Sequence, residues 1–266
     1  MDSNHEAGAV SFVERDIRDG AVWLWLNRPQ RHNALIPELV SDLRSAVARA
    51  AALDPLALVL GARGRSFSTG GDVGGFLEHA ASLADLTAYS ERLVGGLHEA
   101  ILDLLAFPAP VLAAINGPVT GGSTGLMLAA DLVAMAEDAF VQPYYSEVGF
   151  GPDGGWTALL PDRIGTAKAL QIQYRNERIG AAEALALGLA TSICPSADLE
   201  TRIGEWTADL ARGFAQTHRA TREKIWDDQR RAVVRSRLDQ EMTRFLELVT
   251  RPETLEGMRR FKKERA

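Results

Sequence analysis

The 266-residue chain contains a single cysteine, Cys194, so it cannot form an intramolecular disulfide. It also lacks an excess of positive charge. Its formal net charge of -6 argues against a nucleic-acid or anionic-membrane partner held by bulk electrostatics. No apolar run approaches the length that crosses a bilayer, and the acidic start at Met1–Glu6 has no signal-peptide pattern. These absences predict a soluble, cytoplasmic protein.

The sequence has little that could bind a metal ion. Its histidines are scattered without metal-ligand spacing, at His5, His32, His79, His98 and His218. We therefore predict no metal site, and we expect His98 on the polar side of its helix. The basic groups near the C-terminus are interpreted as solvated helix faces; these are Arg230-Arg231 and Arg259-Arg260 with Lys262-Lys263.

Hydrophobic residues make up 46% of the chain, which is enough for a sizeable core. We predict an α/β core over 1–198 and a C-terminal helical segment over 199–266. Within the core, short apolar runs alternate with glycine-rich loops and amphipathic helices, an order typical of α/β folds. Strands are predicted at Val10–Ile17, Ala21–Leu26, Leu56–Leu60, Val111–Ile115, Leu132–Met135, Phe140–Val141 and Ala190–Cys194, and helices at Pro37–Ala52, Leu83–Leu105, Gly154–Leu160, Thr166–Tyr174 and Ala181–Leu187.

Two glycine-rich loops, 61–75 and 116–125, each follow a buried strand. Glycines allow the close approach and the unusual backbone angles that bring two backbone N–H groups to one point. Such a pair forms an oxyanion hole, which suits a thioester carbonyl that becomes an enolate or a tetrahedral oxyanion. The alternative is that these glycines serve only tight turns.

The second loop also fits two other motifs. The segment 121–125 matches the G-x-S-x-G nucleophile elbow of serine hydrolases. Ser123 is separated from the preceding strand by Asn116–Gly122, however, and the only downstream histidine is His218 in an arginine-rich helical segment. The glycine spacing over 117–122 resembles a phosphate-binding loop, but Ser123 stands where that motif needs lysine.

Six ordered segments resemble the crotonase, or enoyl-CoA hydratase/isomerase, superfamily over nearly the whole chain. They are Leu26-Asn27-Arg28-Pro29 with Asn33-Ala34-Leu35, Phe67–Val73, Ile115–Gly122, Gly149–Gly155, Leu160-Pro161 with Ile164-Gly165, and Ala182–Leu189, with a further match at Glu256-Gly257 near the end. The resemblance implies a stacked ββα superhelix with a C-terminal helical segment for trimerisation. It implies an acyl-CoA substrate, no cofactor apart from the coenzyme A of that substrate, and a homotrimer or a dimer of trimers.

The resemblance also assigns roles to residues. The amides of Gly71 and Gly122 would polarise the thioester oxygen, Arg31 would lie near the CoA phosphates, and Ala34 would lie in the adenine region. Asp72 is expected to brace its loop through backbone hydrogen bonds. The full substrate-binding set is Arg31, Ala34, Phe67, Gly70, Gly71, Asp72, Val73, Gly121, Gly122, Tyr145 and Trp156.

The chain departs from the hydratase pattern at both catalytic carboxylates. Hydratases of this family carry two glutamates that orient and deprotonate water, and those positions read Gly125 and Tyr145 here. Without that pair, no general acid/base system places the attacking water. Glu147, which is close to Tyr145 in a segment expected to end a strand, remains open as a displaced base.

Asp153 falls where several double-bond isomerases of the family place their single acidic base. One carboxylate suffices to move a proton within a 3-enoyl-CoA, so we predict an isomerase that forms 2-enoyl-CoA, with Asp153, Gly71 and Gly122 as catalytic groups. Pro152-Asp153-Gly154 is also a good turn sequence by itself. The open alternatives are a hydratase with a displaced base, an enzyme like the aryl-CoA dehalogenases with a nucleophilic aspartate, and a non-catalytic acyl-CoA-binding protein.

Overall fold

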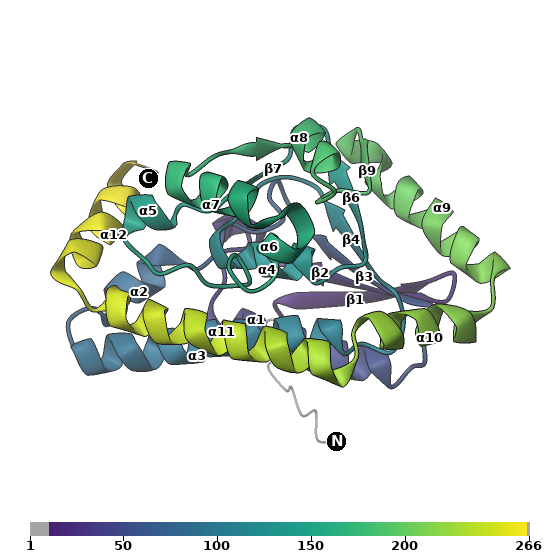
Figure 1. Cartoon of the computed structure of the whole chain (residues 1–266), viewed down its shortest axis with the longest axis horizontal. Coiled ribbons are helices and arrows are strands. Elements are labelled where there is room, and N and C mark those ends of the chain that lie inside the picture. Colours follow the sequence, from purple (N-terminus) through teal and green to yellow (C-terminus); the bar gives the residue numbers. More distant parts are fainter. Residues whose placement is uncertain (1–10, 265–266) are drawn as a thin grey trace, which may run out of the picture.

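The fold is described by a computed structural model that covers residues 11–264. The predicted start of the first strand at Val10 and the acidic segment Met1–Glu6 lie outside the described residues. A six-stranded sheet has the order β1-β2-β3-β4-β6-β9 (Figure 1). Its strands are β1 (Val13–Arg18), β2 (Ala21–Leu26), β3 (Ala57–Ala62), β4 (Val111–Ile115), β6 (Leu132–Ala136) and β9 (Ser192–Cys194).

All pairings in this sheet are parallel except the β1–β2 hairpin. The hairpin turns at Asp19-Gly20, where both residues have positive φ, as a type I′ turn requires. Strands β2, β3 and β4 are buried along their whole length, which explains their continuous apolar sequences. A smaller three-stranded sheet contains β5 (Val119–Thr120), β7 (Phe140–Gln142) and β8 (Ile179–Gly180).

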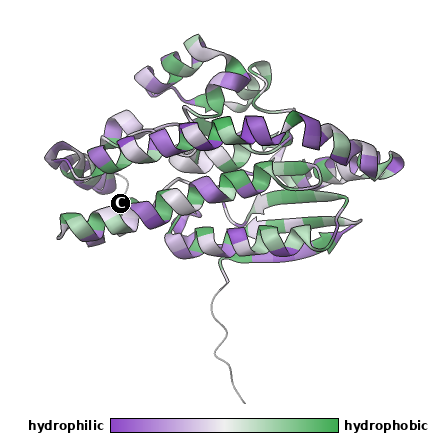
Figure 2. Cartoon of the chain, turned by 60° about the horizontal axis from the view of Figure 1, so that its bottom comes forward, coloured by the Kyte–Doolittle hydropathy of each residue, from purple (hydrophilic) through white to green (hydrophobic). Residues whose placement is uncertain are grey.

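Long helices cover the main sheet. Helix α1 (Pro37–Ala51) packs on β2 and on α3 (Leu83–Leu105), and α11 (Asp228–Val249) also packs on α3. Helix α9 (Leu199–Arg212) contacts β4 and β6 (Figure 1). These helices mix hydrophilic and hydrophobic residues along their length (Figure 2), as helices with only one face on a core do.

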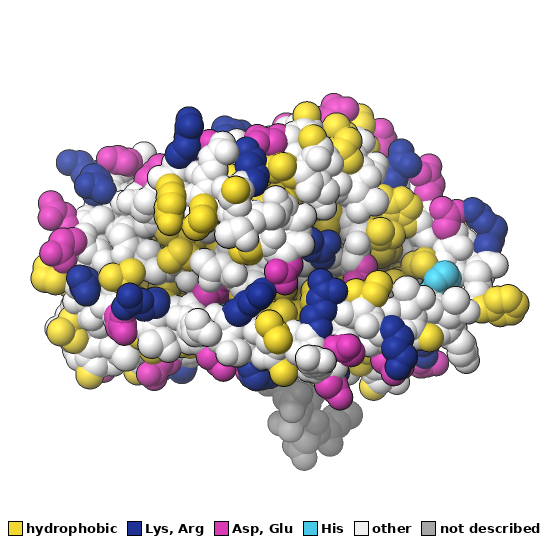
Figure 3. All heavy atoms as spheres, in the orientation of Figure 1, with side chains coloured by type: hydrophobic (Ala, Val, Ile, Leu, Met, Phe, Trp, Pro, Cys, Tyr) yellow, Lys and Arg dark blue, Asp and Glu magenta, His cyan; other side chains and the backbone are white. Residues whose placement is uncertain are grey.

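The remaining helical segments are short, apart from those near the C-terminus. They are η1 (Pro29–Arg31), α2 (Val73–His79), η2 (Gly121–Ser123), α4 (Thr124–Leu128), α5 (Tyr145–Val148), α6 (Leu160–Ile164), α7 (Thr166–Arg175), α8 (Ala181–Ala186), η3 (Ser196–Asp198), α10 (Ala215–Ile225) and α12 (Pro252–Glu264). Within residues 11–264 no helix combines the length and the apolar character that a membrane span requires. On the face shown in Figure 3, acidic and basic side chains are interspersed, so this face carries no single-sign field.

Two local predictions are wrong. Residues 154–159 form turns rather than a helix, because Gly154 and Gly155 have φ of 62° and 87°, outside the right-handed helical region. Tyr145 does not end a strand but begins α5. The boundary at residue 198, and the assembly into a trimer or a dimer of trimers, stay predictions.

Candidate active site

The two glycine-rich loops meet because they follow neighbouring parallel strands, β3 and β4. They are joined by backbone hydrogen bonds from Ser68 N–H to Pro118 O (3.1 Å) and from Thr120 N–H to Ser68 O (3.1 Å). The Ser123 hydroxyl adds a link, since it donates to Ser68 O (3.0 Å) and to Thr120 O (2.8 Å). Ser123 is fully buried and fastens the two loops together, so it is not an exposed nucleophile of a hydrolase elbow.

Gly71 and Gly122, the predicted oxyanion donors, line the same pocket. The loops approach so closely at Gly70 that a Cβ atom there would lie 2.7 Å from Thr120 O, and Gly70 has a φ of 77°. Gly122 lies in the first turn of the 3₁₀ helix η2, where backbone N–H groups have no acceptor within the helix. These glycines therefore do more than serve separate turns, because they bring two loops to the rim of one cavity.

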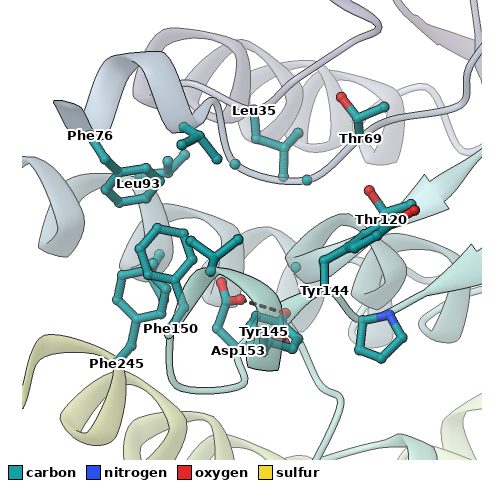
Figure 4. A pocket seen from close by; sticks show the side chains of 18 of the residues that line it. Leu35, Thr69, Phe76, Leu93, Thr120, Tyr144, Tyr145, Phe150, Asp153 and Phe245 are labelled. Atoms are coloured by element: carbon teal, nitrogen blue, oxygen red, sulfur yellow. Dashed lines mark hydrogen bonds between the residues drawn. The ribbon is translucent and has the colours of Figure 1, made fainter. Parts of the chain in front are cut away.

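The cavity has two connected parts, an inner pocket and an outer groove. Both are bordered by Thr69, Gly71, Val73, Thr120, Tyr144 and Phe261. The inner pocket is further lined by Leu35, Gly70, Phe76, Leu93, Val94, Leu97, Gly121, Gly122, Pro143, Tyr145, Val148, Phe150, Asp153 and Phe245 (Figure 4). Among these described residues, Asp153 is the only one with a carboxylate.

Asp153 projects into the inner pocket from the loop after α5 and is 6% exposed. The Tyr145 hydroxyl donates to its Oδ1 at 2.6 Å (Figure 4). Its Oδ2 lies against Gly122, where an added Cβ would be only 2.7 Å away. Burial raises the pKa of Asp153 to about 7; the hydrogen bond from Tyr145 opposes this rise, and the negative charge of Glu241 adds to it.

We expect the buried Asp153 carboxylate to cost folding stability in a pH-dependent way. Its pKa is about 7 in the folded protein and near 3.9 in an unfolded chain, so folding favours the protonated form. The cost is absent below the unfolded pKa and complete above the folded pKa. Asp153→Asn should therefore melt close to wild type at about pH 4 and roughly 8–16 °C higher at about pH 8. Calorimetry at both pH values measures this, and a pH-independent difference would contradict it.

The structure also accounts for the two missing hydratase glutamates. A Cβ atom at Gly125 would lie 2.3 Å from Gly154 O and 2.4 Å from Ile101 Cδ1, so no side chain fits there. Tyr145 occupies the second position and bonds Asp153. Glu147 does not replace either glutamate, because it is exposed, accepts a hydrogen bond from Asn176 and does not line the inner pocket.

The predicted binding residues divide into three groups. Arg31, Ala34, Asp72 and Val73 border the outer groove, and Gly70, Gly71, Val73, Gly121, Gly122 and Tyr145 border the inner pocket. Phe67 and Trp156 border neither part, because both are fully buried in the core. Trp156 instead supports the second glycine-rich loop from the core, because its indole N–H donates to Gly121 O at 2.8 Å.

Asp72 braces its loop as expected. Its Oδ1 accepts the Gly74 N–H at 3.0 Å, and its carboxylate pairs with Arg28 at 2.9 Å and with Arg31 at 3.3 Å. These arginines help to hold the pKa of Asp72 below its usual range against the effect of burial. Lys262, interpreted from sequence as part of a solvated face, borders the outer groove.

Two buried residues that sequence reasoning missed hold the turn after Asp153. Glu241 on α11 accepts the N–H groups of Gly155 (2.8 Å), Thr157 (2.7 Å) and Ala158 (3.0 Å) and the Thr157 hydroxyl (2.7 Å). His98 is buried rather than on the polar side of α3, and its Nε2 accepts the Gly154 N–H at 3.3 Å. Burial lowers the pKa of His98 to about 4, so it is neutral and can accept.

A signal for Glu241 does exist in the sequence. Leu238, Glu241, Phe245 and Val249 follow helical spacing, and all four are buried on one face of α11. A carboxylate on such an apolar stripe needs several hydrogen-bond donors, because an unpaired buried charge is very costly. Across residues 11–264, no group of three His, Cys, Asp or Glu side chains is arranged to hold a metal ion.

Comparison with known proteins places the chain in a family. The sequence profile of the enoyl-CoA hydratase/isomerase family matches residues 16–266. A probable enoyl-CoA hydratase from Rhodobacter capsulatus is 35% identical over 202 residues, which cover 76% of each chain. The 4-chlorobenzoyl coenzyme A dehalogenase-2 of an Arthrobacter species is 32% identical over 202 residues, which cover 75% of this chain and 71% of the relative.

A solved structure of an enoyl-CoA hydratase has the same fold as this chain. An enoyl-CoA hydratase from Bacillus halodurans superposes with a TM-score of 0.88 at 24% identity, covering 94% of this chain and 100% of that one. The chain therefore belongs to the enoyl-CoA hydratase/isomerase family, and its mixed α/β architecture is the crotonase-like fold predicted from the sequence.

Proposed function

We propose that this protein isomerises 3-enoyl-CoA to 2-enoyl-CoA, with Asp153 as its single acid/base. The observation that carries the proposal is one buried carboxylate beside a predicted oxyanion donor, Gly122, in an apolar pocket. A water-adding enzyme of this family needs a second carboxylate. The space for one at Gly125 is filled by backbone and by Ile101.

The arrangement supports a simple proton transfer. The Asp153 carboxylate removes a proton from C2 of the 3-enoyl thioester, and the electron pair of that C–H bond delocalises onto the thioester oxygen to form a dienolate. The amides of Gly71 and Gly122 would stabilise the negative oxygen. The same carboxyl group then returns the proton to C4, which leaves the double bond between C2 and C3. Since Tyr145 holds Oδ1, Oδ2 is the atom that carries the proton.

The outer groove supports a coenzyme A thioester as the substrate. It adjoins the inner pocket and carries the basic side chains of Arg31 and Lys262. These two cations lie close together, since a Cβ on Gly74 would be 3.4 Å from Arg31 Nη2 and 3.5 Å from Lys262 Nζ. Such a pair would attract the phosphates of coenzyme A while the acyl group enters the apolar pocket.

The test is a spectrophotometric panel of 3-enoyl-CoA and 2-enoyl-CoA thioesters with the wild-type enzyme. We expect 3-enoyl-CoA to be converted to the conjugated 2-enoyl-CoA, and water addition to 2-enoyl-CoA to be negligible. Efficient hydration would contradict the proposal. Tight binding with no turnover of either class would favour a non-catalytic acyl-CoA-binding protein.

Tyr145→Phe should shift the pH profile of isomerisation. The reactive form of Asp153 is the carboxylate, so kcat/KM falls as the pH drops below its pKa of about 7. The hydrogen bond from Tyr145 favours the carboxylate, so removing it raises the pKa. We expect the acidic limb to move to higher pH by about one unit, with activity recovering in alkaline solution. Tyr174→Phe, at an exposed tyrosine, is the control, and an unmoved limb would contradict this role of Tyr145.

A second candidate function is nucleophilic dehalogenation of an aryl-CoA. It is favoured by the 32% identity to a 4-chlorobenzoyl coenzyme A dehalogenase. In that reaction Asp153 would attack the ring carbon that carries the halogen, and chloride would leave with its electron pair. Incubation with 4-chlorobenzoyl-CoA, followed by mass spectrometry of the peptide containing Asp153, separates the two functions. Chloride release, with an aryl ester on Asp153 before water hydrolyses it, would favour the dehalogenase, and an unmodified peptide without chloride release would favour the isomerase.

A further inference from the structure

One end of the inner pocket is built from three phenylalanine rings that come from distant parts of the chain. Phe76 lies on α2, Phe150 on the loop after α5, and Phe245 on α11. Their ring centroids are 5.0 Å apart for Phe150–Phe245, 5.1 Å for Phe76–Phe150 and 5.8 Å for Phe76–Phe245. Each ring thus contacts both others. We refer to these three residues as the phenylalanine wall.

The phenylalanine wall stands opposite the entrance from the outer groove. In Figure 4, Phe76, Phe150 and Phe245 lie on one side of Asp153, whereas Tyr144 and Thr120, which border the outer groove, lie on the other. An acyl chain that enters beside Tyr144 and passes Asp153 therefore runs toward the wall.

The wall is backed by packed side chains. Phe76 and Phe245 are each 2% exposed, so neither opens to solvent behind the pocket. Tyr89 meets the Phe76 ring edge-on at 5.2 Å, and the His79 ring stacks on Tyr89 at 4.3 Å. The inner pocket has a cavity volume of about 50 Å³, against about 660 Å³ for the outer groove. The inner pocket is thus small, and the buried rings of Phe76 and Phe245 close its far end.

We propose that the phenylalanine wall sets a length limit on the acyl group, so that the substrates are short unsaturated acyl-CoA thioesters. This proposal rests on the proposed function for the identity of the thioester. Each methylene that the pocket buries should tighten binding about fourfold. A chain that reaches the wall gains nothing from further carbons, because close-packed aromatic rings do not move aside without loss of packing.

The proposal predicts that binding affinity stops rising with acyl length at one point, here called the break. This can be measured with ligands that do not react. Saturated acyl-CoA thioesters from butanoyl to dodecanoyl cannot isomerise, and their affinities can be measured by calorimetry on the wild-type protein. We expect affinity to rise about fourfold per methylene for the shortest members and then to level off or fall. A steady rise to dodecanoyl-CoA would overturn the proposal.

Variants of the wall should move the break. Phe150→Ala removes the ring that is least buried in the core, and Phe245→Leu keeps most of the apolar volume in case a larger truncation does not fold. Both should extend the rising part of the series to longer chains by at least two methylenes, or roughly 16-fold in relative affinity. Phe214→Ala, at a ring that is 85% exposed, should leave the break unchanged.

The outcomes separate this proposal from the proposed function. A break that neither wall variant moves would overturn the length limit even if the enzyme is an isomerase. A break that moves as expected in a protein without isomerase activity would support the length limit and refute only the reaction.

Discussion

Asp153→Asn is expected to lower kcat/KM for 3-enoyl-CoA isomerisation at least about 10³-fold, the middle of the range for loss of a general acid/base. The effect should be large because no other carboxylate among the described residues lines the inner pocket. Asparagine keeps the size of the side chain and can still accept the hydrogen bond from Tyr145, so the pocket should keep its shape. The measurement is a steady-state assay that follows formation of the conjugated 2-enoyl thioester.

The matched control for Asp153→Asn is Glu147→Gln. Glu147 is the nearby glutamate that the sequence leaves open as a displaced base, and it is exposed outside the inner pocket. We expect full activity for Glu147→Gln and unchanged binding of a saturated acyl-CoA for Asp153→Asn. Isomerisation that survives in Asp153→Asn and disappears in Glu147→Gln would reverse the assignment.

The sequence predicts the fold and the two glycine-rich loops well because both produce patterns in short, continuous segments of the chain. The apolar runs of β2, β3 and β4 are continuous and end at turn residues, and α3 shows helical periodicity over its whole length. Since β3 and β4 are parallel neighbours, the loops that follow them reach the same edge. Motif spacing then suffices to identify the crotonase-like fold.

The residues that support Asp153 could not be predicted in the same way. His98 and Glu241 lie on two different helices, 55 and 88 residues from Asp153 along the chain. Their partners are backbone N–H groups, which have no sequence pattern. The turn over 154–159 also depends on this tertiary contact, whereas its local sequence reads as a helix. For Phe67 and Trp156, motif matching indicated the correct loops, but it could not distinguish a residue that lines a pocket from one that packs behind it.

Glu241→Ala is expected to lower stability and activity together. The substitution leaves the buried N–H groups of Gly155, Thr157 and Ala158 without their acceptor. Loss of a buried, multiply bonded carboxylate should cost about 3–5 kcal/mol, or roughly 6–15 °C in melting temperature. Activity should fall because Asp153 directly precedes this turn and depends on it for its position. Thermal unfolding and kcat/KM on the same preparations measure both effects.

Glu241→Gln separates the hydrogen bonds of Glu241 from its charge. Glutamine keeps an oxygen for Thr157 and Ala158, but its amide nitrogen would face the Gly155 N–H, so the loss of stability should be smaller than for alanine. Removing the negative charge also lowers the pKa of Asp153, which should move the acidic limb of the kcat/KM profile to lower pH, opposite to Tyr145→Phe. Glu247→Ala, at an exposed glutamate on α11 that pairs with Arg244, is the control. A melting temperature for Glu241→Ala no lower than that of Glu247→Ala would show that α11 does not hold the turn after Asp153.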